Sequence, residues 1–254
     1  MKHIGLALGG GAVLGAAHVG VFKAVLEHNI NIDYISGTSI GAFAAAFFAF
    51  GKSYEDIEHI ALKLKWIDIS DLSISKFGLL SNGKLGRLIV KHLGDVNIED
   101  ADIPLAIIAT DATNGEKIVM DKGPLAEAVM ASTSIPGIFK PVDVGDRILV
   151  DGGITENVPI DTVRNLGAEF VIAVDLNSKN KYNKPDNILD VLVNSFHFLI
   201  QERVKSQTEK ANLLIEPDLS QFNRTSTKHV DKLIKIGYEE SIECFKYHLT
   251  NLTN

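Results

Sequence analysis

The chain lacks most features that would assign it to nucleic acid, a lipid bilayer or an oxidising compartment. It has one cysteine, Cys244, among 254 residues, so it can form no internal disulfide. Its net charge is −7 and its lysines and arginines form no long run, which excludes the basic surface that nucleic acids need. Its most apolar stretch, residues 41–50, is about half of the 20 residues that cross a bilayer. With no signal-peptide pattern at its start, we expect a cytoplasmic protein that binds no nucleic acid.

The chain does contain apolar runs that alternate with turn residues, as globular α/β proteins do. Residues 4–8 form an apolar run that ends at three glycines, and residues 16–27 follow with apolar side chains at helical spacing. Residues 34–50 repeat this order of strand, tight turn and helix. Two such units in succession predict a three-layer α/β/α fold with a mostly parallel central sheet.

The remaining pattern predicts one domain over residues 1–254, with residues 176–254 as a C-terminal helical part. Further strands are expected over residues 105–110, 117–120, 148–150 and 170–174. Asn114-Gly115 indicates a hairpin between the first two of these, which would make the sheet mixed. Helices are expected after Pro124 and Pro159, over residues 188–204 and 230–249, and through most of residues 52–102.

A Gly-x-Ser-x-Gly turn at residues 37–41 lies between the second predicted strand and the second helix. Small residues two positions before and after the serine let the backbone pass closely, so that the serine sits on a strained turn and faces a pocket. This predicts Ser39 as a nucleophile, with Gly37 and Gly41 as the glycines of its elbow. The alternative is that Ser39 only caps the helix that follows it.

The glycine-rich loop at residues 9–15 also joins a strand to a helix, and its N–H groups are suited to an anion. Its glycines do not match the dinucleotide-binding spacing, and alanines 16 and 17 stand where a phosphate loop needs lysine and serine or threonine. The remaining interpretations are an oxyanion hole at Gly10, Gly11 and Ala12, or a close-packed turn that binds nothing.

Asp151 follows the strand predicted over residues 148–150 and precedes Gly152 and Gly153. A carboxylate at the end of a strand, on a backbone freed by two glycines, can approach another group closely. Asp-Gly is also a common turn pair, so the residues alone leave both interpretations open.

These three features, in this order, resemble those of the patatin-like phospholipase family. Its nucleophile elbow is similar to residues 37–41, and its second motif is similar to residues 151–153. Residues 131–139 resemble the segment that precedes this aspartate, and the similarity extends over residues 4–175 and includes 210–219. The chain differs in the glycine loop, where Leu14 occupies the place of a basic residue and Ala12 that of a glycine.

The resemblance implies a hydrolase that cleaves carboxylic esters of lipids through an acyl-Ser39 intermediate. Asp151 would take the Ser39 proton directly, and neither a cofactor nor a metal would be needed. A triad with His197, His229 or His248 as the base is the alternative, although His197 and also His18 are expected to be structural. An acyltransferase and a regulatory protein without turnover also remain open.

A lipid or other acyl ester is thus the expected partner. Because lipids are found in membranes, we also expect contact with a membrane. Because the net charge is −7, we expect this contact to be weak, reversible and apolar. The candidate contact segments are the apolar side of residues 188–204, which we expect to pack mainly inward, and residues 66–80.

Overall fold

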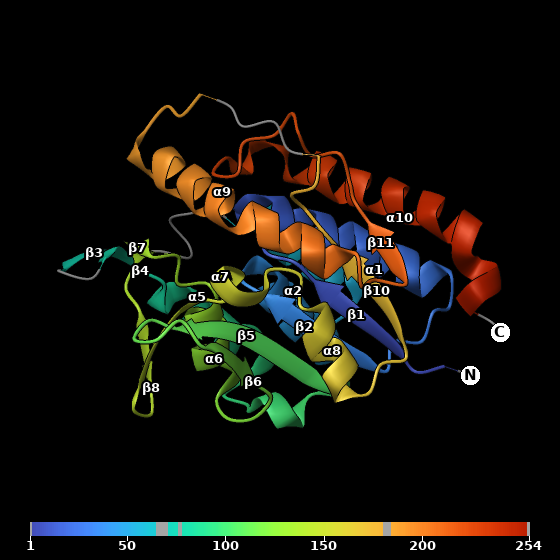
Figure 1. Cartoon of the computed structure of the whole chain (residues 1–254), viewed down its shortest axis with the longest axis horizontal. Helices are drawn as coiled ribbons and strands as arrows, with labels where there is room; N and C mark the ends of the chain where they lie inside the picture. The colour runs from blue at the N-terminus through green and yellow to red at the C-terminus, as the bar shows by residue number, and fades with distance from the viewer. Residues whose placement is uncertain (1, 65–70, 76–77, 180–183, 253–254) are drawn as a thin grey trace.

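The computed structural model describes residues 2–64, 71–75, 78–179 and 184–252, and it has three layers (Figure 1). A twisted central sheet lies between helices α7 (Gly153–Glu156), α8 (Ile160–Leu166) and α9 (Ile188–Thr208) in front and helices α1 (Ala17–Glu27) and α2 (Ile40–Ala49) behind. The expected α/β/α fold is confirmed.

The main sheet has eight strands within the described residues. In spatial order they are β11 (Leu213–Ile215), β10 (Phe170–Val174), β1 (Ile4–Leu8), β2 (Tyr34–Thr38), β5 (Leu105–Asp111), β9 (Arg147–Asp151) and β8 (Val142–Val144), with β6 (Lys117–Met120) also paired to β5. The pairs from β11 to β5 are parallel, whereas β5–β6, β5–β9 and β9–β8 are antiparallel. The sheet is therefore mixed, and the turn at Gly115, with φ of 75°, is the expected hairpin.

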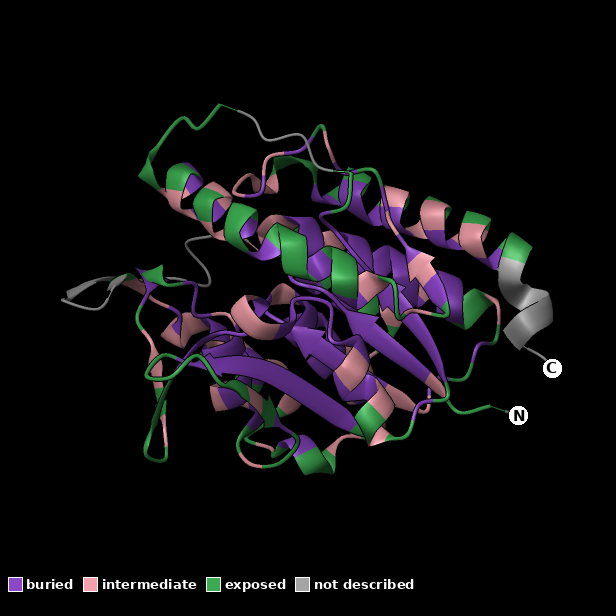
Figure 2. Ribbon diagram, viewed as in Figure 1, coloured by how far each residue is buried: buried purple, intermediate pink, exposed green. Residues whose placement is uncertain are grey.

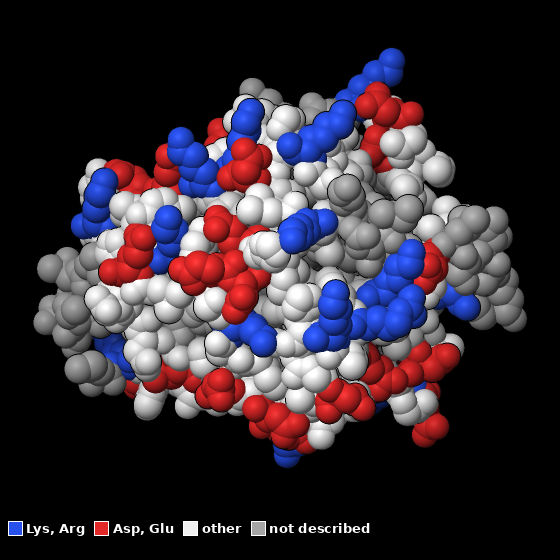
Figure 3. Space-filling model, turned by 180° about the vertical axis from the view of Figure 1, so that it is seen from behind, with Lys and Arg blue, Asp and Glu red and all other residues white. Residues whose placement is uncertain are grey.

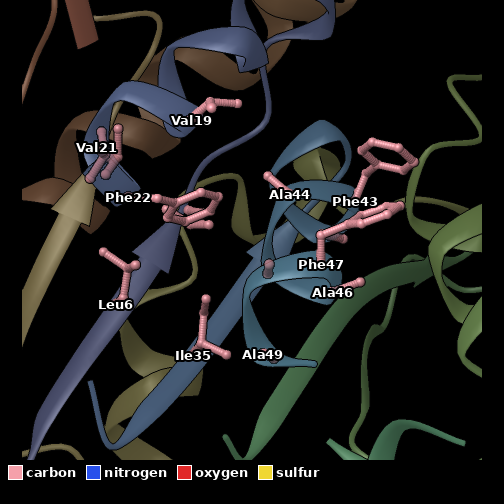
Figure 4. Close-up of a cluster of buried hydrophobic side chains, with 14 of the residues drawn as sticks. Leu6, Val19, Val21, Phe22, Ile35, Phe43, Ala44, Ala46, Phe47 and Ala49 are labelled. Atoms are coloured by element: carbon pink, nitrogen blue, oxygen red, sulfur yellow. The ribbon is translucent and has the colours of Figure 1, made fainter. Parts of the chain in front are cut away.

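The central strands β1, β2, β5 and β10 bury both of their faces, and apolar residues dominate their sequences for this reason. On one face, Leu6 and Ile35 pack against Phe22 of α1 and the apolar side of α2 (Figure 4). On the other face, Ala7 and its neighbours in β10 pack against α8 and α9. Successive side chains of a strand point to opposite faces, so a run without polar residues fits only a sheet covered on both sides (Figure 2).

The back layer also contains α6 (Leu125–Ser132) and α10 (Val230–Leu252), with α3 (Tyr54–Lys63) and α5 (Gly83–Leu93) outside it. Three short 3₁₀ turns complete the described elements: η1 (Ala12–Ala16), η2 (Ile98–Asp100) and η3 (Thr227–His229).

Two segments differ from the sequence-based expectation. The segment 52–102 is not helical throughout, because β3 (Asp71–Ser75) and β4 (Gly78–Ser81) form a small second sheet with β7 (Gly137–Phe139). In residues 71–75 polar and apolar types alternate, which is the strand period that the helical interpretation overlooked. The C-terminal part of the chain, expected as helical, also contributes strand β11 to the main sheet.

Helix α9 is apolar on more than its inner side. Ile200 and Val204 are buried as expected, but Ile188 and Leu199 are 61% and 80% exposed. In the second candidate contact segment, residues 66–70 and Phe77 lie outside the described residues. Of the helices that the structure describes, none has the length and apolar character needed to cross a bilayer.

Candidate active site

Ser39 occupies the turn between β2 and α2, with φ of 55° and ψ of −126°. A residue other than glycine is strained in this conformation, and such strain is common at functional sites. A Cβ on Gly41 would lie 2.1 Å from the Leu8 carbonyl oxygen, and one on Gly37 would lie 2.5 Å from the Gly41 carbonyl oxygen. Both positions therefore require glycine. The Ser39 side chain makes no capping hydrogen bond to α2, which rules out the helix-cap interpretation.

Strand β5 sets the position of Asp151 relative to Ser39. On one side of β5, Ile108 pairs with Thr38, the residue before Ser39. On its other side Ala109 pairs with Asp151. Strand β9 runs antiparallel to β5 and so approaches from the opposite direction to β2, and its last residue, Asp151, stops one residue of β5 away from the level at which β2 ends. Consecutive residues of β5 thus bring two residues distant in the sequence to nearly the same level of the sheet.

Asp151 is fully buried, and its Oδ1 accepts a hydrogen bond of 2.8 Å from the Gly153 N–H. Burial raises the pKa of Asp151 to about 7, while the nearby Ser39 hydroxyl and the Gly153 N–H lower it in part. Its Oδ2 has no hydrogen bond of normal geometry among the described residues. The Ser39 hydroxyl is thus close enough to affect the Asp151 carboxylate.

The glycine loop lies directly over Ser39. The N–H of Gly10 donates to the Asn157 carbonyl oxygen at 3.1 Å, so it is not free for a ligand. This corrects the expectation that Gly10 donates to an anion together with Gly11 and Ala12. The N–H groups of the latter two have no acceptor within the described part of the chain. Ala12 has φ of 52°, a left-handed conformation that favours the glycine it replaces.

Several buried polar groups hold this loop from behind. His18 Nε2 donates to the Gly9 carbonyl oxygen at 2.8 Å, and burial lowers its pKa to about 4, so His18 is a neutral structural residue as expected. Asn177 Nδ2 donates to the Gly10 carbonyl oxygen at 2.7 Å. The Val13 N–H donates to the Arg224 carbonyl oxygen at 3.0 Å. The sequence analysis missed Asn177 and Arg224, which no motif marks.

The other histidines do not form a triad in the described residues. His197 is buried, and burial together with the nearby Arg224 charge lowers its pKa to about 3. His229 is exposed on η3, and the His248 side chain lies outside the described ones. Among the described groups no histidine hydrogen-bonds to Ser39 or Asp151. The site therefore brings together a serine, a carboxylic acid and free backbone N–H groups.

An apolar cavity, partly open to solvent, begins at Ser39. Its walls include residues of η1, α1, α2, α3 and α5, and Ser39 and Asn82 are among its few polar residues. Phe43 and Phe47 lie on the side of α2 that faces it, with their ring centroids 4.9 Å apart (Figure 4). Binding sites for organic ligands are mostly apolar with a few polar groups, and the lining of this cavity suits a hydrocarbon chain.

The charge of the rear face and the placement of possible metal ligands bear on whether a second kind of site exists. On the rear face, lysines and arginines are interspersed with aspartates and glutamates, with acidic side chains along the lower edge (Figure 3). Among the described residues, no group of three or more His, Cys, Asp or Glu side chains comes together as a metal site would require.

Sequence comparison relates the chain to a family of lipid hydrolases. A profile of the family described as patatin-like phospholipase matches residues 6–164. A Mycobacterium tuberculosis protein of the NTE family is 36% identical over 177 residues, which are 68% of this chain and 49% of that protein. Neuropathy target esterase sws of Drosophila melanogaster is 35% identical over 185 residues, 70% of this chain and 13% of that protein. The chain spans about half, or less, of these relatives.

Solved structures show the same fold. VipD from Legionella pneumophila matches with a TM-score of 0.68 and 16% identity, covering 98% of this chain and 67% of VipD. ExoU from Pseudomonas aeruginosa, in complex with SpcU, matches with a TM-score of 0.55 and 15% identity, covering 98% of this chain and 53% of that one. At these identities the likeness extends to the fold alone.

Proposed function

The chain belongs to the patatin-like phospholipase family, and from this premise we propose that it is a serine hydrolase that cleaves carboxylic ester bonds of lipids. The observation that supports this most is the position of Ser39, which lies on a strained turn between the buried Asp151 and an apolar cavity. Asp151 can activate the Ser39 hydroxyl, and the cavity can hold the acyl chain of an ester.

In the proposed reaction Asp151 removes the proton of Ser39 as Oγ attacks the ester carbonyl carbon. The negative oxygen of the tetrahedral intermediate then accepts hydrogen bonds from the N–H groups of Gly11 and Ala12. When the intermediate collapses, Asp151 returns the proton to the leaving alcohol and the acyl group stays on Ser39. Water, deprotonated by the same carboxylate, then attacks the acyl-serine, and Asp151 returns this proton to Ser39 Oγ as the fatty acid leaves.

The environment of Asp151 favours its use as a base without a histidine. An aspartate in water has a pKa near 4, too low to accept a proton efficiently at neutral pH. Burial raises the pKa of Asp151 to about 7, which is close to the pKa of a free histidine. A carboxylate with this pKa is ionised in part at neutral pH and still accepts a proton.

The cavity supports an acyl ester with a long hydrocarbon chain as substrate. Ala44, Phe47 and Ile60 bring apolar side chains to its wall, away from Ser39. Burying each CH₂ group of a chain there contributes about 0.8 kcal/mol. The relatives' names point to similar chemistry in those proteins, one being an esterase and another, from Rattus norvegicus, a patatin-like phospholipase domain-containing protein.

The test is a panel of phospholipid, lysophospholipid and neutral acyl esters, assayed with wild-type protein and with Ser39→Ala. We expect fatty acid release by the wild type and a loss of at least about 10³-fold in the variant. A fluorophosphonate probe should label the wild type and not Ser39→Ala. Equal release by both proteins would refute the proposal.

The same assay, repeated with an added alcohol acceptor, separates hydrolysis from acyl transfer. We expect free fatty acid as the main product. A predominance of new ester would identify an acyltransferase, and an unlabelled wild-type serine with no product would identify a regulatory protein.

A further inference from the structure

The glycine loop at residues 9–15 contains no charged residue. Leu14, its largest residue, is fully buried in the main hydrophobic core, where it packs with α1 and the sheet. The loop nevertheless lies next to a buried cation from a distant segment. Arg224 is 5% exposed, and its own carbonyl oxygen accepts the Val13 N–H at 3.0 Å.

Arg224 is linked to the loop through one side chain. Its Nη2 donates to Asn177 Oδ1 at 3.2 Å, and Asn177 Nδ2 donates to the Gly10 carbonyl oxygen at 2.7 Å. Since a guanidinium group can only donate, it fixes which end of the Asn177 amide faces the loop. The backbone N–H of Asn177 also donates to Asp175 Oδ1 at 2.9 Å, and this bond fixes the backbone of Asn177.

The Gly10 carbonyl and the Gly11 N–H belong to one planar peptide unit. A hydrogen bond accepted by this carbonyl therefore orients the N–H at the opposite side of the unit and increases its polarity. The Asn177 amide, itself polarised by the Arg224 charge, is the donor of that bond. The Gly10 N–H, which donates to Asn157, fixes the preceding peptide unit in turn.

We propose that Arg224 is a positioning residue that acts through Asn177 on the Gly10–Gly11 peptide unit and so brings a positive charge to a loop that has none of its own. This inference rests on the proposed function. The positive charge acts on the developing oxyanion through a relay of hydrogen bonds, and it need not touch the substrate. Because the oxyanion is common to all esters, the effect of Arg224 should not depend on the acyl chain or the alcohol.

The kinetic test compares Arg224→Met, Arg224→Lys and Asn177→Leu with wild type on p-nitrophenyl butyrate and on a long-chain phospholipid. Arg164→Met is the matched control. Arg164 lies in α8, away from the glycine loop, and its guanidinium group likewise donates a hydrogen bond within the protein, to the Lys210 carbonyl oxygen at 2.9 Å. Rates are normalised to folded protein by circular dichroism.

We expect Arg224→Met to lower kcat about 10- to 100-fold on both substrates with little change in KM, less than the ~10²- to 10³-fold that follows loss of a direct donor. Arg224→Lys should restore part of the rate. The double variant Arg224→Met/Asn177→Leu should lose no more than the worse single variant, since both residues act in one relay. A raised KM with kcat unchanged, or a loss on the phospholipid alone, would overturn the proposal in favour of substrate binding.

A second measurement does not depend on turnover. In protein labelled with ¹⁵N-glycine, the Gly11 amide proton should move upfield in Arg224→Met and Asn177→Leu and stay in place in Arg164→Met. An unmoved Gly11 resonance in Arg224→Met would overturn the relay. The wild type could also prove to cleave no ester while its Gly11 resonance still shifts in the Arg224 and Asn177 variants. That result would support the relay and overturn only the proposed function.

Discussion

Gly10 passes so close to Ser39 that a Cβ placed on Gly10 would lie 3.1 Å from the Ser39 Cβ and 2.7 Å from Asn157 Oδ1. The glycine loop and the proposed nucleophile are therefore in direct contact at Gly10. The buried Asn157 leaves no room on the other side of this contact.

Replacement of Gly10 by alanine should therefore displace the loop from Ser39. We expect Gly10→Ala to lower kcat by about 10²-fold, because a shift of about 1 Å in a reacting group has this effect, while the protein stays folded. The measurement is kcat on a short ester, together with a circular dichroism spectrum. Gly83→Ala is the matched control, since a Cβ at Gly83 would meet its nearest atom at 3.4 Å, and its kcat should equal that of wild type. If Gly10→Ala is as fast as this control, the loop does not take part in the reaction.

Replacement of Asp151 by asparagine should remove activity as completely as Ser39→Ala. The two residues would act as one unit, and losses within such a unit do not add. By contrast His197→Ala, His229→Ala and His248→Ala should each keep most of the activity, measured as kcat/KM on one ester. A histidine variant as inactive as Ser39→Ala, with its fold preserved, would show that a triad operates instead.

The activity and the stability of the protein should respond to pH in opposite directions. The base form of Asp151 is the ionised one, so kcat/KM should rise with pH around a midpoint near the pKa of about 7. The folded protein holds the Asp151 proton up to this pH, whereas the unfolded chain loses it near 4, so the free energy of unfolding should fall between these values by roughly 1.4 kcal/mol per pH unit.

Asp151→Asn should abolish this loss of stability. We expect the variant to resemble wild type in urea unfolding below pH 4 and to be more stable by several kcal/mol, on the order of 4, above pH 7. Glu156→Gln, at a buried acid that is ion-paired to Lys117 at 2.9 Å, is the control and should destabilise instead. An Asp151→Asn variant less stable than wild type at pH 8 would contradict the raised pKa.

A large side chain in the apolar cavity should change the choice of acyl chain. Ala44 lies in the cavity wall on α2, between one and two helical turns beyond Ser39. We expect Ala44→Trp to lower kcat/KM for long-chain esters at least about 10-fold and to change it little for a butyrate ester. The ratio of the two rates is the measurement. An unchanged ratio would mean that the acyl chain binds elsewhere.

The local parts of the site could be predicted from the sequence, because the small residues that they require lie within a few positions of the functional residue. Gly37 and Gly41 mark the elbow by their fixed spacing around Ser39, and Gly152 allows the chain after Asp151 to pass the Ile108 carbonyl oxygen, only 2.3 Å from where a Cβ would lie. The alternation of strands and helices likewise predicted the layers of the fold.

The parts that depend on distant partners could not be predicted. The Gly10 N–H donates to the backbone carbonyl of Asn157. Every residue has such a carbonyl, so the residue type at position 157 does not reveal this bond. The direction of β9 is also a property of the whole sheet, since an apolar run of its length fits a parallel and an antiparallel strand equally well. Arg224 and Asn177 reach the loop from two further segments, and a single arginine or asparagine has no distinctive spacing.

The pairing of β5 with both β2 and β9 has a consequence for how the protein regains its activity after denaturation. The serine side of the site needs Thr38 to meet Ile108 of β5, and the aspartate side needs Asp151 to meet Ala109 of the same strand. Both pairings join residues far apart in the sequence, so both close long loops and form slowly. A chain that has made only one of the two pairings would hold Ser39 or Asp151 in place without the other and would remain inert until the second strand docks.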